Sequence, residues 1–124
     1  MKWWYVKRFL HPDLVPGASA GYSHVVVLDE DVTLAPGFDA SRFFSLAAQL
    51  QLDLVQPAHD AQPAGTRLEA FLVRDPRRGV DSPGGAFVGY RTNFVECGPF
   101  VAVSARAWPC VWKLLQPDLV TGYG

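Results

Sequence analysis

Three consecutive carboxylates, Asp29, Glu30 and Asp31, follow directly on the apolar run at residues 25–28. Neighbouring like charges repel one another, and the cost is tolerable only in water or beside a cation. On an extended backbone side chains alternate, so Asp29 and Asp31 would share one side and Glu30 would point the other way. The triplet is therefore either a solvated polar turn or part of a site for a divalent cation such as Mg²⁺ or Mn²⁺.

Two enzyme classes use carboxylates in this pattern. In a nucleotide-sugar-dependent glycosyltransferase, a D-x-D pair holds the cation on the donor diphosphate. In a Mg²⁺-dependent phosphohydrolase of the haloacid-dehalogenase type, an apolar strand precedes D-x-D-x-T, a pattern that Asp29, Asp31 and Thr33 satisfy. Asp29 would then accept the phosphoryl group and Asp31 would be the general acid, with Ser104 and Lys113 as candidates for the later motifs. No Asp-Asp pair follows Asp31 to complete that magnesium site.

The elements around the triplet predict an α/β layered fold. Helical spacing marks residues 2–10, a helix capped by Asp39 or Ser41, and a last helix capped by Ser104. The β-branched run at 25–28 is typical of a strand buried on both faces, which usually belongs to a parallel sheet. Further strands are expected at residues 53–57, 66–73 and 92–104, and an exposed mobile loop rich in Pro and Gly at 74–90.

Length, composition and charge limit the kinds of protein that this chain could be. A chain of 124 residues with 49% hydrophobic and 19% charged residues is sufficient for one small globular domain. The formal net charge of -1 argues against a nucleic-acid partner. No run approaches the roughly 20 consecutive apolar residues of a membrane helix, so we expect no membrane segment in this chain. Cys97 and Cys110 are too few for a disulfide framework, and we expect both to be buried thiols, with a disulfide between them as the alternative.

Several segments in order resemble one known family. They are "KWWYVKRFLHPDLV", "LDEDV", "LDLVQPA" and "FVECGPFVAVSARAWPCVWKLLQPDLVTGYG". They are similar to a plant and algal domain family of unknown function, some members of which carry the description lysine-ketoglutarate reductase trans-splicing related. The family's fold resembles the GT-A type of glycosyltransferase. The resemblance runs from Lys2 to Gly124, and residues 58–91 are its divergent part.

The resemblance implies that residues 1–124 are a single incomplete GT-A-like domain, a partial layered sheet with flanking helices. The family's nucleotide-binding first strands would precede Lys2, and its sequence would continue past Gly124. The implied reaction is metal-dependent transfer of a sugar from a nucleotide-sugar donor to an unknown glycan, protein or small-molecule acceptor. Little or no activity is expected from this chain alone. Full-length members resemble single-pass proteins of Golgi and other secretory-pathway membranes.

The same resemblance implies roles for the charged residues near the triplet. Asp29 and Asp31 would hold Mn²⁺ or Mg²⁺ against the donor diphosphate, and Glu30 would support the turn. Lys7 and Arg8 lie on the helix before the strand and would either face phosphate or form a solvated helix face.

Two later acidic residues are candidates for catalysis and acceptor binding. Glu96 falls in an apolar strand-like segment, where an unpaired carboxylate is costly. It would bind a sugar hydroxyl, act as catalytic base, or pair with an arginine such as Arg91 or Arg106. Asp118 would contact the acceptor or, as we expect, cap the end of the last helix. The non-enzymatic alternative is a truncated interaction protein.

Overall fold

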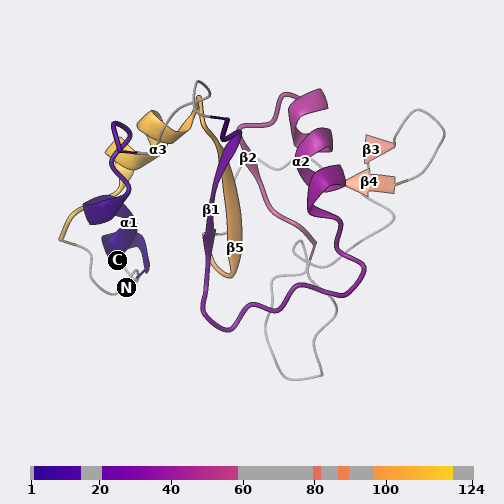
Figure 1. Ribbon diagram of the computed structural model, residues 1–124, viewed down its shortest axis with the longest axis horizontal. Coiled ribbons are helices and arrows are strands. Elements are labelled where there is room, and N and C mark those ends of the chain that lie inside the picture. Colours follow the sequence, from indigo (N-terminus) through magenta and orange to yellow (C-terminus); the bar gives the residue numbers. More distant parts are fainter. Residues whose placement is uncertain (1, 15–20, 59–79, 82–86, 90–96, 119–124) are drawn as a thin grey trace. The chain divides into compact units, whose positions relative to one another are not determined.

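A computed structural model describes residues 2–14, 21–58, 80–81, 87–89 and 97–118 (Figure 1). The chain forms two compact units, one of residues 1–56 with 96–124 and one of residues 57–95. The predicted strand at 66–73 and the first residues of the one at 92–104 lie outside the described residues. The helices and strands are α1 (Lys2–Phe9), β1 (His24–Leu28), α2 (Ala40–Gln49), β2 (Leu54–Val55), β3 (Val80–Asp81), β4 (Phe87–Gly89), β5 (Phe100–Ser104) and α3 (Trp108–Leu114).

The second unit contains an antiparallel pair of short strands. Val80 of β3 lies opposite Gly89 of β4, and Asp81 lies opposite Phe87. The sequence predicted only a loop at residues 74–90, because its Pro, Gly and charged residues conceal these two- and three-residue strands.

The first unit is built on a three-stranded antiparallel sheet in the order β1-β5-β2. His24 of β1 lies opposite Ser104 of β5, and Leu28 lies opposite Phe100. The prediction of a parallel sheet is therefore wrong. The strand buried on both faces is β5, since Phe100, Val101, Ala102 and Val103 are all buried, whereas Val26 and Leu28 of β1 remain exposed.

Local signals set the starts of α2 and α3. Asp39 caps α2, since its carboxylate accepts a hydrogen bond from Arg42 N at 3.0 Å. Pro109 lies in the first turn of α3, where its missing N–H costs no hydrogen bond. Ser104 is not the cap of α3, because the helix begins after Ala107. Ser104 lies one turn earlier, and its Oγ accepts a hydrogen bond from Ala107 N at 3.2 Å.

One part of the core lies between the sheet and α2. Phe100 and Ala102 of β5, Val55 of β2 and Ala47 of α2 form a buried cluster. Three partly buried apolar side chains pack against it, those of Phe43, Phe44 and Leu52. Ala47 thus lies on the apolar face that α2 turns toward the sheet.

The other face of β5 presents Val101 and Val103, since neighbouring side chains alternate along a strand. Val27 of β1 lies opposite Val101 and is also buried. Figure 1 shows α1 and α3 on the side of the sheet away from α2, and Trp108 of α3 is 2% exposed. The sheet is therefore the middle layer of three in this unit.

Reciprocal contacts join α1 to α3. Trp112 Nε1 donates to Lys7 O at 3.1 Å, and Lys7 Nζ donates to Trp112 O at 2.8 Å. The same ammonium lies 3.6 Å from the centroid of the Trp112 ring, a cation–π contact. Trp108 Nε1 donates to Leu10 O at 3.1 Å. Trp108 is thus part of the core between α3 and the sheet.

Two further expectations concern exposure. No helix in the described part of the chain is long and apolar enough to cross a bilayer. Cys97 and Cys110 are both exposed, so the prediction of buried thiols is wrong. Cys110 follows Trp108 by two residues, which places it on the opposite side of α3 from that buried ring.

Candidate functional site

The carboxylate triplet occupies a turn at the carboxyl end of β1. Asp29 N donates to Pro99 O at 3.0 Å, and Val32 N donates to Asp29 O at 3.3 Å, which closes a turn over residues 29–32. Because the backbone turns here, the strand alternation that we expected to align Asp29 with Asp31 does not apply. Glu30 and Asp31 are exposed, and Asp29 is half-buried.

Asp29 has a cationic partner that the sequence reasoning missed. Lys2 Nζ lies 2.7 Å from Asp29 Oδ1 and also donates a hydrogen bond to Gly98 O. Trp3 Nε1 donates to Cys97 O at 3.3 Å, so the first turn of α1 is fixed to the segment just before β5. No sequence signal pointed to Lys2, because its partners are far away along the chain and it reads only as the first residue of a helix.

The two basic residues predicted near phosphate have other neighbours in the structure. Lys7 Nζ is bound to the carbonyl oxygen and ring of Trp112. The guanidinium carbon of Arg8 lies 5.4 Å from the ring centroid of Trp4, and Arg8 is exposed. Lys7 therefore holds α1 against α3, whereas Arg8 remains on the surface.

The donor atoms of the acidic turn fit a hard cation as part of a larger shell. Carboxylate oxygens, as in Asp29 and Asp31, are the ligands that Mg²⁺ and Mn²⁺ prefer. Among the described residues, no group of three His, Cys, Asp or Glu side chains is arranged to hold a metal ion. Mg²⁺ commonly takes one or two protein carboxylates and completes its shell with water and substrate phosphates. The turn supplies carboxylate donors of that type, and Asp29 Oδ1 is paired with the Lys2 ammonium.

The remaining predicted site residues are not brought to this turn by any described contact. Glu96 and its suggested partner Arg91 lie outside the described residues. Asp118 is exposed in a turn after α3, whose C-terminal cap is Leu115. Arg106, the other partner suggested for Glu96, is bound to Asp53.

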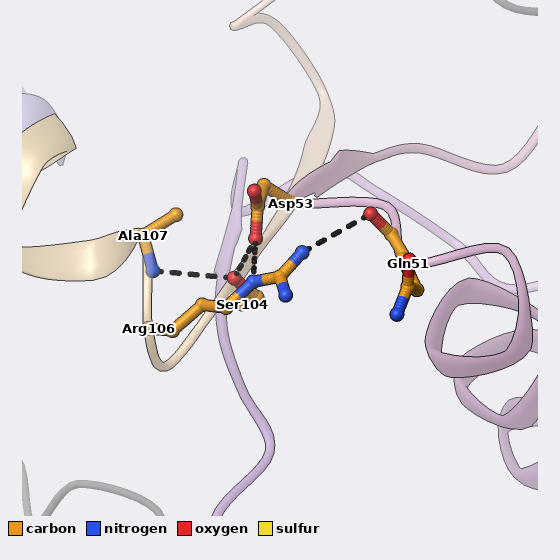
Figure 2. Close-up of polar contacts among 5 residues, drawn as sticks. All are labelled: Gln51, Asp53, Ser104, Arg106 and Ala107. Atoms are coloured by element: carbon orange, nitrogen blue, oxygen red, sulfur yellow. Dashed lines mark hydrogen bonds and ion pairs between the residues drawn. The ribbon is translucent and has the colours of Figure 1, made fainter.

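A polar cluster joins β2, β5 and the start of α3 (Figure 2). Asp53 Oδ1 accepts hydrogen bonds from Arg106 Nε and from Ser104 Oγ, each at 2.6 Å. Arg106 Nη2 donates to Gln51 O at 3.1 Å. The hydrogen bonds from Arg106 and then Ser104 lower the pKa of Asp53, and Asp53 raises the pKa of Arg106. A carboxylate with a lowered pKa is a poor general base, so the cluster acts as a structural clamp.

The strand register keeps Ser104 away from the acidic turn. Ser104 lies opposite His24, whereas the turn follows Leu28 at the other end of β1. At about 3.3 Å per residue, four strand residues correspond to roughly 13 Å. The later phosphohydrolase motif that we assigned to Ser104 is therefore not assembled with Asp29.

We expect Ser104→Ala to lower the free energy of unfolding by about 1–2 kcal/mol, because Asp53 loses a donor and Ala107 N loses an acceptor. Urea denaturation followed by circular dichroism would measure the change. The matched control is Ser45→Ala, at an exposed position of α2, where we expect little change. Equal effects of the two substitutions would contradict the clamp.

The Asp53 clamp also predicts a pH dependence. The pKa of Asp53 is below its ordinary value of 3.8 in the folded chain, so the ionised form stabilises the fold. This stabilisation is complete above the unfolded pKa and is lost as the pH falls through the lower, folded pKa. The difference in unfolding free energy between wild type and Asp53→Asn should therefore be constant from pH 7 to 5 and shrink below about pH 4. A difference that stays constant down to pH 2 would refute the pairing.

Comparison with known proteins adds one finding. A family model with the description "Protein of unknown function (DUF707)" matches residues 1–124. Comparisons with curated proteins and with solved structures each gave no match. The predicted membership of a domain family of unknown function is thus confirmed, and the observed fold is a mixed α/β structure with a small antiparallel sheet. Over its whole length, this chain belongs to the DUF707 family.

Proposed function

We propose that this chain carries part of the donor-binding site of a metal-dependent glycosyltransferase with a GT-A-like fold. The observation that supports it most is the acidic turn at the carboxyl end of β1, where Glu30 and Asp31 are exposed and the half-buried Asp29 lies beside the Lys2 ammonium. The turn offers oxygen ligands to Mn²⁺ or Mg²⁺ and a positive charge to phosphate. The donor would be a nucleotide sugar, and the acceptor an unknown glycan, protein or small molecule.

In this proposal Asp29 and Asp31 would hold the cation, which would neutralise the diphosphate leaving group when bound. The hydrogen bond from Asp29 N to Pro99 O fixes the base of the turn against β5. Glu30 would support the turn. Glu96 as catalytic base and Asp118 at the acceptor remain part of the proposal, as does a Golgi or secretory-pathway membrane location for the full-length protein.

Support for the phosphohydrolase alternative is weaker. That chemistry needs a hydroxyl and an ammonium close to the nucleophilic Asp29. Ser104, its candidate hydroxyl, lies at the far end of β1 from the acidic turn and is already bound to Asp53. Lys2 supplies an ammonium at Asp29, but the lysine that the phosphohydrolase motif would use is Lys113.

The test is calorimetric titration of the full chain with Mn²⁺ and uridine diphosphate. We expect Asp31→Ala to lower the affinity for Mn²⁺ about tenfold or more. Loss of a residue that only supports a metal ligand typically costs about tenfold or more, and loss of the ligand itself should cost at least as much. Asp13→Ala is the matched control, since Asp13 is an exposed aspartate that lies beside His11. If Asp31→Ala binds Mn²⁺ and uridine diphosphate as tightly as wild type does, the glycosyltransferase proposal is refuted. Hydrolysis of p-nitrophenyl phosphate that disappears in Asp29→Asn would instead establish the phosphohydrolase.

A further inference from the structure

The acidic turn already holds a positive charge of its own. Lys2 Nζ lies 2.7 Å from Asp29 Oδ1, and the two side chains are 19% and 35% exposed. Lys2 also donates to Gly98 O, while Asp29 is held through its backbone by Pro99 O. The ion pair is therefore partly shielded from solvent and joined to two neighbouring carbonyl groups.

A divalent cation bound at Asp29 would come close to this ammonium. Two positive charges a few ångströms apart repel, and the repulsion grows as water is excluded. The carboxylate is fixed by the turn, but the lysine ammonium is carried on a flexible four-carbon stem. Of the two partners in the ion pair, Lys2 is thus the one that can move.

We propose that Lys2 is a resident counter-ion of the acidic turn. It neutralises Asp29 in the empty site, leaves it when a divalent cation binds, and pairs with the diphosphate that arrives with the cation. The inference rests on the proposed function and adds a regulatory property to it. Mn²⁺ alone is opposed by Lys2, whereas Mn²⁺ together with a nucleoside diphosphate is favoured, so the site takes up the two as a unit.

The displacement need not disturb the rest of α1. Val6 is buried, Lys7 is bound to Trp112, and Leu10 O accepts a hydrogen bond from Trp108. In the first turn, Trp3 Nε1 also donates to Cys97 O, and Trp4 packs edge-on against Tyr5 and Phe9. A variant that lacks the Lys2 charge should therefore keep its helix in place.

The experiment uses calorimetry on the full chain, first with Mn²⁺ alone and then with uridine diphosphate at saturating Mn²⁺. In Lys2→Met we expect Mn²⁺ alone to bind about two- to fivefold more tightly, the worth of a partly exposed ion pair. We expect uridine diphosphate to bind about tenfold more weakly, because a charge-assisted contact to phosphate is lost. Lys113→Met, at an exposed position of α3, is the matched control and should change neither affinity.

The opposite signs separate this role from a merely structural one, in which both affinities would fall. If wild type binds Mn²⁺ and uridine diphosphate, and Lys2→Met leaves the two affinities unchanged or lowers both of them, the role of Lys2 is overturned and the proposed function stands. If wild type binds no Mn²⁺, the role of Lys2 and the proposed function are both overturned. Should Lys2→Met not fold, the ¹⁵N resonance of the wild-type Lys2 ammonium provides the readout. Mg²⁺ with uridine diphosphate should shift the Lys2 signal and leave that of Lys113 in place, and an unmoved Lys2 signal would refute the inference.

Discussion

Trp108→Ala should lower the free energy of unfolding by about 3–5 kcal/mol, the usual cost of truncating a buried tryptophan. Trp108 is among the largest fully buried side chains of the described residues and is 2% exposed. Truncation would leave a cavity between α3 and the sheet. It would also remove the donor to Leu10 O, which ties the end of α1 to α3. Since small domains are stable by only about 5–15 kcal/mol, this variant should lie close to unfolding.

Guanidinium denaturation followed by circular dichroism at 222 nm measures this loss without relying on tryptophan fluorescence. Leu114→Ala is the matched control in the same helix, since Leu114 is 76% exposed. We expect that control to change stability by less than about 0.5 kcal/mol. Similar losses in both variants would show that Trp108 does not anchor the α1–α3 layer.

Phe100→Ala should cost a comparable amount, about 3–5 kcal/mol, on the opposite face of the sheet. Phe100 is 3% exposed, and its ring centroid lies 5.8 Å from that of Phe43 and 6.2 Å from that of Phe38. The substitution removes the ring at the centre of this aromatic group, and edge-to-face pairs contribute beyond the area they bury.

Urea denaturation of Phe100→Ala beside Phe9→Ala tests this expectation, because Phe9 is an aromatic residue that is 57% exposed. A loss of less than about 1 kcal/mol in Phe100→Ala would mean that the α2 layer repacks around the vacancy. Phe100 also lies opposite Leu28, just before the acidic turn. The same variant should therefore weaken binding of Mn²⁺ with uridine diphosphate.

Helix positions could be predicted from the sequence because their signals are local. The apolar spacing of residues 2–10 matches α1 and Asp39 caps α2 as expected, whereas α3 begins at Trp108 and not directly after the predicted cap, Ser104. Each of these signals is complete within a few residues and depends little on the rest of the chain.

Strand pairing and the site contacts could not be predicted in the same way. The run at residues 25–28 reads as a doubly buried strand, but its burial depends on β5 and on which faces the helices cover. The pairs Lys2–Asp29 and Asp53–Arg106 each join residues that are distant in sequence. The alternation of side chains along a strand predicts which residues share a face. It does not predict which strand is the partner, or whether the pair is parallel or antiparallel.

The strand order has a consequence for how this protein is made. Both β1 and β2 pair with β5, and they do not pair with each other. β1 begins at His24 and β2 at Leu54, whereas β5 begins only at Phe100. During synthesis, β1 and β2 therefore leave the ribosome before their common partner exists, and this sheet can close only after β5 has been made. Pairings so distant in sequence also form slowly, so the nascent chain depends on β5 to bury the apolar residues of β1.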